Sequence, residues 1–397
     1  MTAGEPRYRR ALRTALRLLL AFGVLEACSA GAISISNRLY GPQIVTRRSI
    51  IASQDSEIDR FLSTPGGKLQ LDPVLGWRYR PGFIGAGDTV SSQGLRGSRE
   101  YAAAPPEGSE RLAVFGDSFA YCSEVAPPDC WTAKVEAGWH GEVLNYGVPG
   151  YGTDQVLLRY LNSPERRVPS PTVLIGFAPV NLRRNVNRYR QFLDPREQLL
   201  FKPRFIIDGA GELKRIDPPV GNDAELRAFR GSFEALRRAG LNDHWYEPII
   251  YENPLIDWVA SVRLASWIWV KLRRWLFDPE RLALDGEINP RSGHFRLQLK
   301  LLRDFADSVS SRGSVPYFLL FPNHGSVIRD RDGQSTQYHA IMDSLAVGEV
   351  PIIDLIEALR EYPGPVSDLF MPGNHYSPAA NDLVARTISE RFGLNAR

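Results

Sequence analysis

Five short apolar segments, each followed by turn residues, constrain the fold of this chain more than any other feature. They lie at residues 112–116, 142–147, 172–178, 315–321 and 350–355. Segments that are apolar throughout and alternate with amphipathic helices are typical of a parallel sheet covered on both faces. The pattern therefore predicts an α/β fold with a three-layer, flavodoxin-like five-stranded parallel sheet. A site is expected at the carboxyl ends of the strands.

The length and composition fit one large domain with additions. The chain has 397 residues, of which 43% are hydrophobic and 23% charged, and its net charge is +3. No block of basic residues stands out in the folded region, so nucleic acid is not an expected partner. Three cysteines, Cys28, Cys122 and Cys130, show no zinc-binding spacing. No metal ion or organic cofactor is implied.

The N-terminus predicts a membrane anchor. Residues 1–17 contain five arginines, and a largely apolar run follows at residues 18–36. This run is just long enough to cross a hydrocarbon core of ~30 Å. Glu26 interrupts it, at a cost of about 3 kcal/mol if the carboxylate lies at the centre of the bilayer. The arginines favour a cytoplasmic N-terminus and an extracytoplasmic C-terminal domain. A cleaved or lipidated signal peptide and an amphipathic core helix are the alternatives.

The rest of the chain divides into a connector and a main domain. Residues 37–110 contain Pro and Gly turns and are predicted to pack on the domain formed by residues 111–397. The strand–helix alternation breaks between about 187 and 292, which predicts an inserted hairpin and helical segment. Residues 202–216 predict the hairpin, and residues 259–277 predict a helix rich in Trp, Leu and Arg. That helix could form a lid, contact a membrane surface or simply pack on the domain.

The strongest chemical signal is a serine at the end of the first predicted strand. Gly116, Asp117 and Ser118 follow the apolar segment directly and open a helix. The backbone N–H of Ser118 would then lie at a helix N-terminus, where unpaired donors and the helix dipole favour an oxyanion. The alternative is a strand–helix turn that Asp117 and Ser118 merely cap.

Four short segments, in order along the chain, resemble the motif blocks of the SGNH/GDSL hydrolase family. They are residues 115–119 (FGDSF), 145–153 (NYGVPGYGT), 176–182 (GFAPVNL) and 374–378 (NHYSP). The resemblance covers roughly residues 70–395 without the insertion. The upstream segments LGWRYRPG and QGLRG also look like a membrane-anchored branch of the family.

The resemblance implies a role for each block. It makes Ser118 the nucleophile and His375 the base that takes its proton. It places the N–H groups of Ser118 and Gly150 and the side-chain amide of Asn181 in an oxyanion hole. The usual Asn-Asp pair of the third block is Asn-Leu here. His324 also follows a predicted strand and is the rival base.

One departure from the family pattern concerns the acid that orients the histidine. The family has an aspartate three residues before the histidine, and Pro372 stands at that position here. Asp368, seven residues before His375, is the predicted replacement. Asn374 or a backbone carbonyl could orient the imidazole instead and leave a dyad.

Three functions agree with these motifs. The first is a serine esterase that acts on an acylated extracytoplasmic substrate, such as a glycan or lipid ester, through an acyl-enzyme on Ser118. The second is an O-acyltransferase that modifies a cell-envelope polysaccharide with the same residues. The third is an inactive, membrane-tethered scaffold or binding protein. Cys122 and Cys130, eight positions apart, form either a disulfide or two separately buried thiols.

Overall fold

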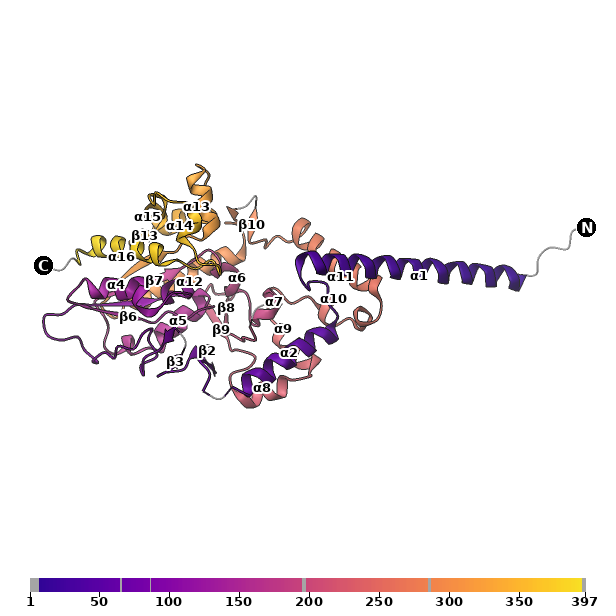
Figure 1. Ribbon diagram of the computed structural model, residues 1–397, viewed down its shortest axis with the longest axis horizontal. Coiled ribbons are helices and arrows are strands. Elements are labelled where there is room, and N and C mark those ends of the chain that lie inside the picture. Colours follow the sequence, from indigo (N-terminus) through magenta and orange to yellow (C-terminus); the bar gives the residue numbers. More distant parts are fainter. Residues whose placement is uncertain (1–6, 65, 86, 195–197, 285–286, 395–397) are drawn as a thin grey trace, which may run out of the picture.

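The computed structural model describes residues 7–64, 66–85, 87–194, 198–284 and 287–394. An α/β body contains most of the chain, and one long N-terminal helix projects from it (Figure 1). The C-terminus lies at the end of the body away from this helix.

A five-stranded parallel sheet forms the centre of the body and confirms the predicted strands. Its strands are β5 (Arg111–Phe115), β6 (Glu142–Asn145), β7 (Thr172–Phe177), β12 (Val315–Leu320) and β13 (Ile352–Asp354). Their order across the sheet is β13-β12-β7-β5-β6, and every neighbouring pair is parallel. This order is that of flavodoxin-like sheets, in which the chain reverses its winding beside the first strand.

Alternate residues along β5 enter two separate cores, one on each face of the sheet. Ala113 and Phe115 join the core under α5 (Thr153–Leu161) and α12 (Gly293–Ser310). Leu112 and Val114 join the opposite core. That core includes side chains from α4 (Trp131–Ala137), α13 (His324–Arg331), α15 (Ile356–Arg360) and α16 (Pro378–Phe392). Both faces of the sheet are buried, which explains why its strands are apolar throughout.

Residues 37–110 pack on the body. They contain α2 (Arg47–Leu62) and two short antiparallel pairs, β1 (Leu69–Asp72) with β2 (Gly76–Tyr79) and β3 (Ile84–Gly85) with β4 (Asp88–Thr89). Trp77 is fully buried, and its Nε1 donates to the carbonyl of Pro149 at 3.3 Å. The connector thus supports the loop that carries Gly150.

The inserted segment has a core of its own. After α7 (Arg190–Leu193), the predicted hairpin forms from β8 (Arg204–Ile207) and β9 (Leu213–Ile216). Its helices are α8 (Asp223–Phe229), α9 (Phe233–Gly240), α10 (Pro248–Tyr251) and α11 (Ala260–Leu276), and the pair β10 (Ala283–Leu284) and β11 (Glu287–Ile288) follows. Tyr189, Phe192, Phe201 and Phe229 pack together with residues of α2.

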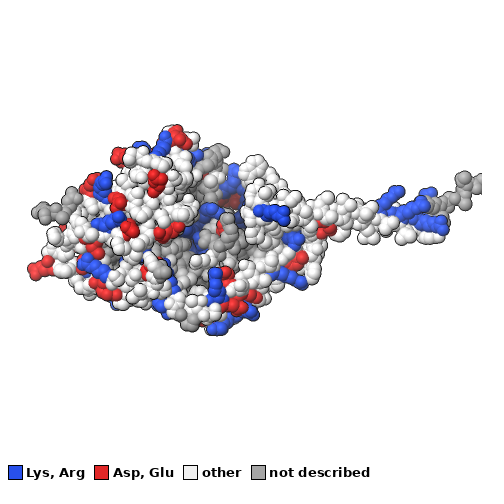
Figure 2. Space-filling view, viewed as in Figure 1, with Lys and Arg blue, Asp and Glu red and all other residues white. Residues whose placement is uncertain are grey.

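The N-terminal helix is longer than the apolar run predicts. Helix α1 spans Arg7–Tyr40, and most of its side chains are exposed. Within the described ranges it is the one helix long and apolar enough to cross a membrane by length and composition. Figure 2 shows charged side chains gathered near the tip of α1 and an uncharged stretch between this tip and the body.

Candidate active site

The turn after β5 positions Ser118. Strand β5 ends at Phe115, and the short helix α3 (Ser118–Tyr121) begins at the serine itself. Asp117 caps this helix, because its Oδ1 accepts a hydrogen bond from the N–H of Phe119 at 3.0 Å. Gly116 has no room for a side chain, since an added Cβ would lie 2.6 Å from that of Ala120. The close turn therefore places Ser118 at the carboxyl edge of the sheet.

The loop after β6 lies beside this turn. The N–H of Val148 donates to the carbonyl of Gly116 at 3.1 Å. Gly150 has a φ of +84°, a conformation that favours glycine. Among the described residues, the N–H groups of Ser118 and Gly150 have no hydrogen-bond acceptor. Two unpaired backbone donors near one turn are suited to a developing oxyanion.

Asn181 joins the same site, but its amide already has acceptors. It opens α6 (Asn181–Asn185), directly after β7, and is buried. Its Nδ2 donates to Asp117 Oδ2 at 3.0 Å and to the carbonyl of Tyr151 at 3.1 Å. Its Oδ1 accepts from the N–H of Ala178. Asn181 therefore holds the turn that carries Ser118 in place and, in this arrangement, has no amide hydrogen left over for an oxyanion.

Arg184, which the sequence motifs do not single out, shares the partners of Asn181. Its Nη1 lies 3.1 Å from Asp117 Oδ2 and 3.1 Å from the carbonyl of Tyr151. Asp117 is fully buried, and a buried carboxylate needs a cation or hydrogen-bond donors to remain charged. Arg184 and Asn181 supply both, so they fix the aspartate beside Ser118.

His375 contacts the carboxylate of Glu124, which lies in the segment that follows α3. Its Nδ1 lies 2.6 Å from Oε2 of Glu124, and the N–H of Gly373 donates to Oε1 of the same carboxylate at 2.9 Å. An ionised carboxylate only accepts hydrogen bonds, so Nδ1 carries the proton and Nε2 is the basic nitrogen. Glu124 thus fixes the tautomer that a base facing a serine needs.

The acid beside His375 is Glu124 and not Asp368. Asp368 lies in an exposed turn, and its described contacts are made by its backbone, which accepts from Ser377 Oγ at 2.6 Å. The sequence does not point to Glu124, because this residue belongs to no motif block and lies 251 positions before the histidine that it contacts.

Strained backbone surrounds this acid–histidine pair. Cys122, Glu124 and Asn374 have φ values of 59°, 70° and 65°. The described part of the chain contains only one other non-glycine residue with positive φ, Asn242. Such conformations are costly and concentrate at functional sites, where the surrounding structure enforces them. A disulfide between Cys122 and Cys130 ties down the segment that carries Glu124.

Burial and hydrogen bonding act in opposite directions on the pKa of Glu124. Partial burial alone would raise the pKa of its carboxyl group. The hydrogen bonds from His375 and from the N–H of Gly373 oppose burial and bring the net pKa below its ordinary value. The carboxylate therefore stays ionised at neutral pH.

The two predicted catalytic groups lie at one edge of the sheet. The ring of Phe119, which follows Ser118, lies 5.7 Å from the ring of His375 between centroids. It also packs edge-on against Tyr376 at 4.8 Å. Ser118 and His375 share no hydrogen bond in the described chain. Hydrogen bonds between catalytic groups are often long without substrate, so this arrangement is compatible with proton transfer.

His324 lies near the same edge but lacks an orienting acid. It begins α13, and its ring packs against Phe370 at 5.2 Å between centroids. No carboxylate contacts its ring among the residues that the structure describes. The geometry therefore favours His375 as the base.

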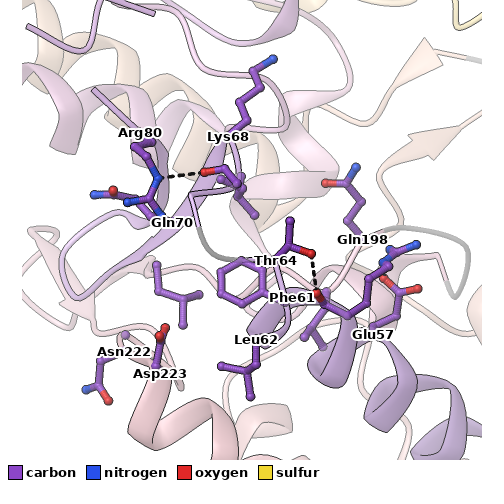
Figure 3. Close-up of a pocket in the computed structure, with 16 residues that line it drawn as sticks. Glu57, Phe61, Leu62, Thr64, Lys68, Gln70, Arg80, Gln198, Asn222 and Asp223 are labelled. Carbon is purple, nitrogen blue, oxygen red and sulfur yellow. Dashed lines mark hydrogen bonds and ion pairs between the residues drawn. The ribbon is translucent and has the colours of Figure 1, made fainter. Parts of the chain in front are cut away.

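A large cavity lies away from these residues. It has a volume of about 730 Å³ and lies between the end of α2, β1 and residues 198–199 and 221–223 (Figure 3). Polar groups of both charges line it, among them Glu57, Lys68 and Asp223. Neither Ser118 nor His375 lines it, so this cavity is separate from the candidate site. A smaller crevice of about 390 Å³ does include Glu124.

The described residues contain no group of three or more His, Cys, Asp or Glu side chains that could hold a metal ion.

Comparisons with known proteins do not establish a family or a reaction for this chain. No family model matches the chain, and no curated protein matches it. Among solved structures, it is similar to the lipase/acylhydrolase from Enterococcus faecalis, with 15% identity and a TM-score of 0.33 over 71% of this chain and 95% of that chain. At this level of similarity, the reaction has to be inferred from the site itself.

Proposed function

We propose that this protein is a serine hydrolase of the SGNH type that cleaves an acyl ester through Ser118, His375 and Glu124. The observation that supports this most directly is the 2.6 Å contact between Glu124 and Nδ1 of His375, on the sheet edge that carries Ser118. A serine hydroxyl is a poor nucleophile without a base, and a histidine held by a carboxylate is the usual base.

The proposed reaction has two steps. Nε2 of His375 accepts the proton of Ser118 as its Oγ attacks the ester carbonyl. The N–H groups of Ser118 and Gly150 stabilise the tetrahedral oxyanion, and each such donor contributes about 3 kcal/mol at comparable sites. The alcohol then leaves with the proton from His375. Water, activated by the same imidazole, hydrolyses the acyl-enzyme and regenerates Ser118.

Asp117, Asn181 and Arg184 position the nucleophile in this proposal. Asn181 and Arg184 hold the Asp117 carboxylate, and that carboxylate caps the helix that begins at Ser118. A residue that acts through another affects rate by alignment, and misplacement of reacting groups by about 1 Å can cost about 100-fold. Asn181 is thus assigned a positioning role instead of direct oxyanion contact.

We also propose that α1 anchors the protein in a membrane, with the catalytic body on the extracytoplasmic side. The arginines near the start of α1 support this orientation, because basic residues favour the cytoplasmic side. The substrate would then be an acylated molecule of the cell envelope or the extracellular space.

Hydrolysis of p-nitrophenyl acetate by the purified full chain tests the proposed reaction. Ser118→Ala and His375→Ala are each expected to lower kcat/KM by roughly 1,000-fold or more, with unchanged far-UV circular dichroism. His324→Ala, at the same edge, serves as the control and is expected to retain activity. Activity that survives in Ser118→Ala would contradict the proposal. A folded wild-type chain without activity towards a series of acyl esters would instead favour a binding protein.

A further inference from the structure

Helix α11 exposes an unusual number of large apolar side chains. Ile268, Trp269, Leu272, Trp275 and Leu276 recur at helical spacing and are all exposed. The opposite side of the helix, including Ser266 and Val270, is buried. Phe277 and Trp258 extend the exposed strip beyond both ends of the helix. A continuous apolar strip on a protein surface marks a contact with a partner or with lipid.

A partly buried contact joins the start of α11 to the middle of α1. The backbone N–H groups of Ala260 and Ser261 donate to the two carboxylate oxygens of Glu26, at 2.6 and 3.0 Å. These N–H groups belong to the first turn of α11, which has no intrahelical acceptors for them. Glu26 is the one acidic residue in the apolar run of α1, and this contact gives its charge a partner.

The two helices run side by side in the same direction. The start of α11 lies level with Glu26, and Val270 and Lys271 lie across a small cavity from Tyr40 and Gln43. Fourteen residues separate Glu26 from Tyr40 and Ala260 from Arg274, and a helix rises 1.5 Å per residue. Both helices therefore cover about 21 Å over the shared stretch.

This alignment fixes how deep α11 lies if α1 spans a bilayer. We place Arg17 at the cytoplasmic edge of the hydrocarbon core. From there, α1 needs ~20 residues to cross a core of ~30 Å. Only residues 18–25 of this span precede the contact with α11. The part of α1 from Glu26 to the outer edge of the core therefore lies beside the first turns of α11, so these turns face the outer leaflet.

We propose that the exposed strip of α11 is inserted in the outer leaflet of the same bilayer that α1 crosses. This proposal rests on the proposed anchoring by α1. Unpaired backbone N–H groups are costly in lipid, and Glu26 removes that cost at the start of α11. Tryptophans are the residues most enriched at membrane interfaces, where Trp269 and Trp275 would lie.

The charged groups near the strip are paired with groups of opposite charge. Arg273 and Arg274 pair with Glu247 on the body side of the helix. Arg48 lies over the ring of Trp258 at 4.1 Å, and both Arg48 and Arg47 pair with Asp257 just before the start of α11. The bilayer thus covers the strip without leaving an isolated charge in the hydrocarbon. Docking at two places would also hold the body in one orientation above the membrane.

Depth-dependent fluorescence quenching tests this proposal on the full chain in phosphatidylcholine vesicles. Cys28→Ser removes the free thiol, and single cysteines then carry an environment-sensitive fluorophore. Trp258→Cys and Trp275→Cys report on the strip, where the native side chains are 68% and 66% exposed. Leu20→Cys reports on the anchor, and Val347→Cys reports on the far body, with exposures of 69% and 88%.

The expected result is that nitroxide-labelled lipids quench the probes at 20, 258 and 275 by roughly half or more, and leave the probe at 347 unchanged. Quenching at 20 without quenching at 258 and 275 would overturn the docking of α11 and leave the anchor intact. Absence of quenching at all four positions would overturn both. Ester hydrolysis measured on the same samples separates these outcomes from failure of the proposed reaction.

Discussion

Two contacts between a carboxylate and a nitrogen side chain in this molecule have opposite surroundings. Glu124 and His375 meet at the carboxyl edge of the sheet, and their side chains are 29% and 25% exposed. Lys202 and Asp154 are both fully buried, where residue 202 of the insertion meets the start of α5. The first pair orients a candidate base, whereas the second joins the insertion to the body.

The solvent exposure of each pair decides how much that pair contributes to the stability of the fold. Even a full ion pair that is partly solvated adds only about 0–1 kcal/mol to stability, so loss of the Glu124–His375 contact should alter reactivity more than folding. A buried pair is costly to break, because the remaining charge has no partner. Loss of Lys202 should therefore alter folding, with little direct effect on the reacting groups.

Lys202→Met is expected to give the largest change in stability. It removes a buried ammonium that contacts Asp154 and donates to the carbonyls of Asn187 and Pro203. We expect the free energy of unfolding to fall by about 3–5 kcal/mol. Chemical denaturation of the detergent-solubilised chain measures it. Lys300→Met, which removes a lysine of a partly exposed i,i+4 pair with Asp304, is the control and should cost less than about 1 kcal/mol. Equal losses in both variants would contradict the comparison.

Glu124→Gln is expected to affect activity and spare the fold. The amide cannot hold His375 by the same charge-assisted bond, so kcat/KM should fall by roughly 100-fold while the free energy of unfolding changes by less than about 1 kcal/mol. Asp368→Asn is the matched control, because Asp368 is the nearest acid that precedes the histidine in the sequence yet does not contact it. A larger loss of activity in Asp368→Asn than in Glu124→Gln would reverse the assignment.

Loss of the disulfide should lower both the free energy of unfolding and the esterase activity. The Cys122–Cys130 bond closes a short loop that contains Glu124. Short loops lie at the low end of disulfide stabilisation, so the double variant Cys122→Ser/Cys130→Ser should lose about 2 kcal/mol of unfolding free energy. Its esterase activity should fall as well, because Glu124 is then less well fixed. A Cys28→Ser variant, which leaves the disulfide intact, should match the wild type in both measurements.

The smallest expected effect is the pH dependence that the Glu124–His375 contact gives to the free energy of unfolding. The pKa of Glu124 lies below its ordinary value of 4.5, so the folded state favours the ionised form. Its contribution to stability is therefore complete above that ordinary value and is lost as the pH falls through the lowered pKa. The difference in unfolding free energy between wild type and Glu124→Gln should shrink as the pH is lowered from 5 towards 3. A difference that grows over this range would contradict an ionised Glu124.

The sequence predicts the sheet and the sheet edge well. Apolar segments that alternate with helices specify the five strands, and turn residues after β5, β6 and β7 specify where Ser118, Gly150 and Asn181 lie. These predictions depend on local patterns, which a single sequence contains.

The partners of those residues could not be predicted, because they depend on contacts between distant segments. Glu124 reaches His375 only through a left-handed backbone turn and the loop before α16. The amide of Asn181 faces Asp117 instead of open space because Arg184 and Tyr151 complete the cluster. Glu26, which looks unfavourable in a membrane helix, gains a partner only when α11 is placed beside it.

Covalent labelling with a fluorophosphonate tests the central claim most directly. The reagent is applied to the full chain, the modified peptide is mapped by mass spectrometry, and the rate of labelling is compared among variants. We predict that wild type and Asp368→Asn are labelled on Ser118 at equal rates. Glu124→Gln should be labelled much more slowly, and His375→Ala should not be labelled. Modification of a residue other than Ser118, or equal rates in wild type and Glu124→Gln, would contradict a site built from Ser118, His375 and Glu124.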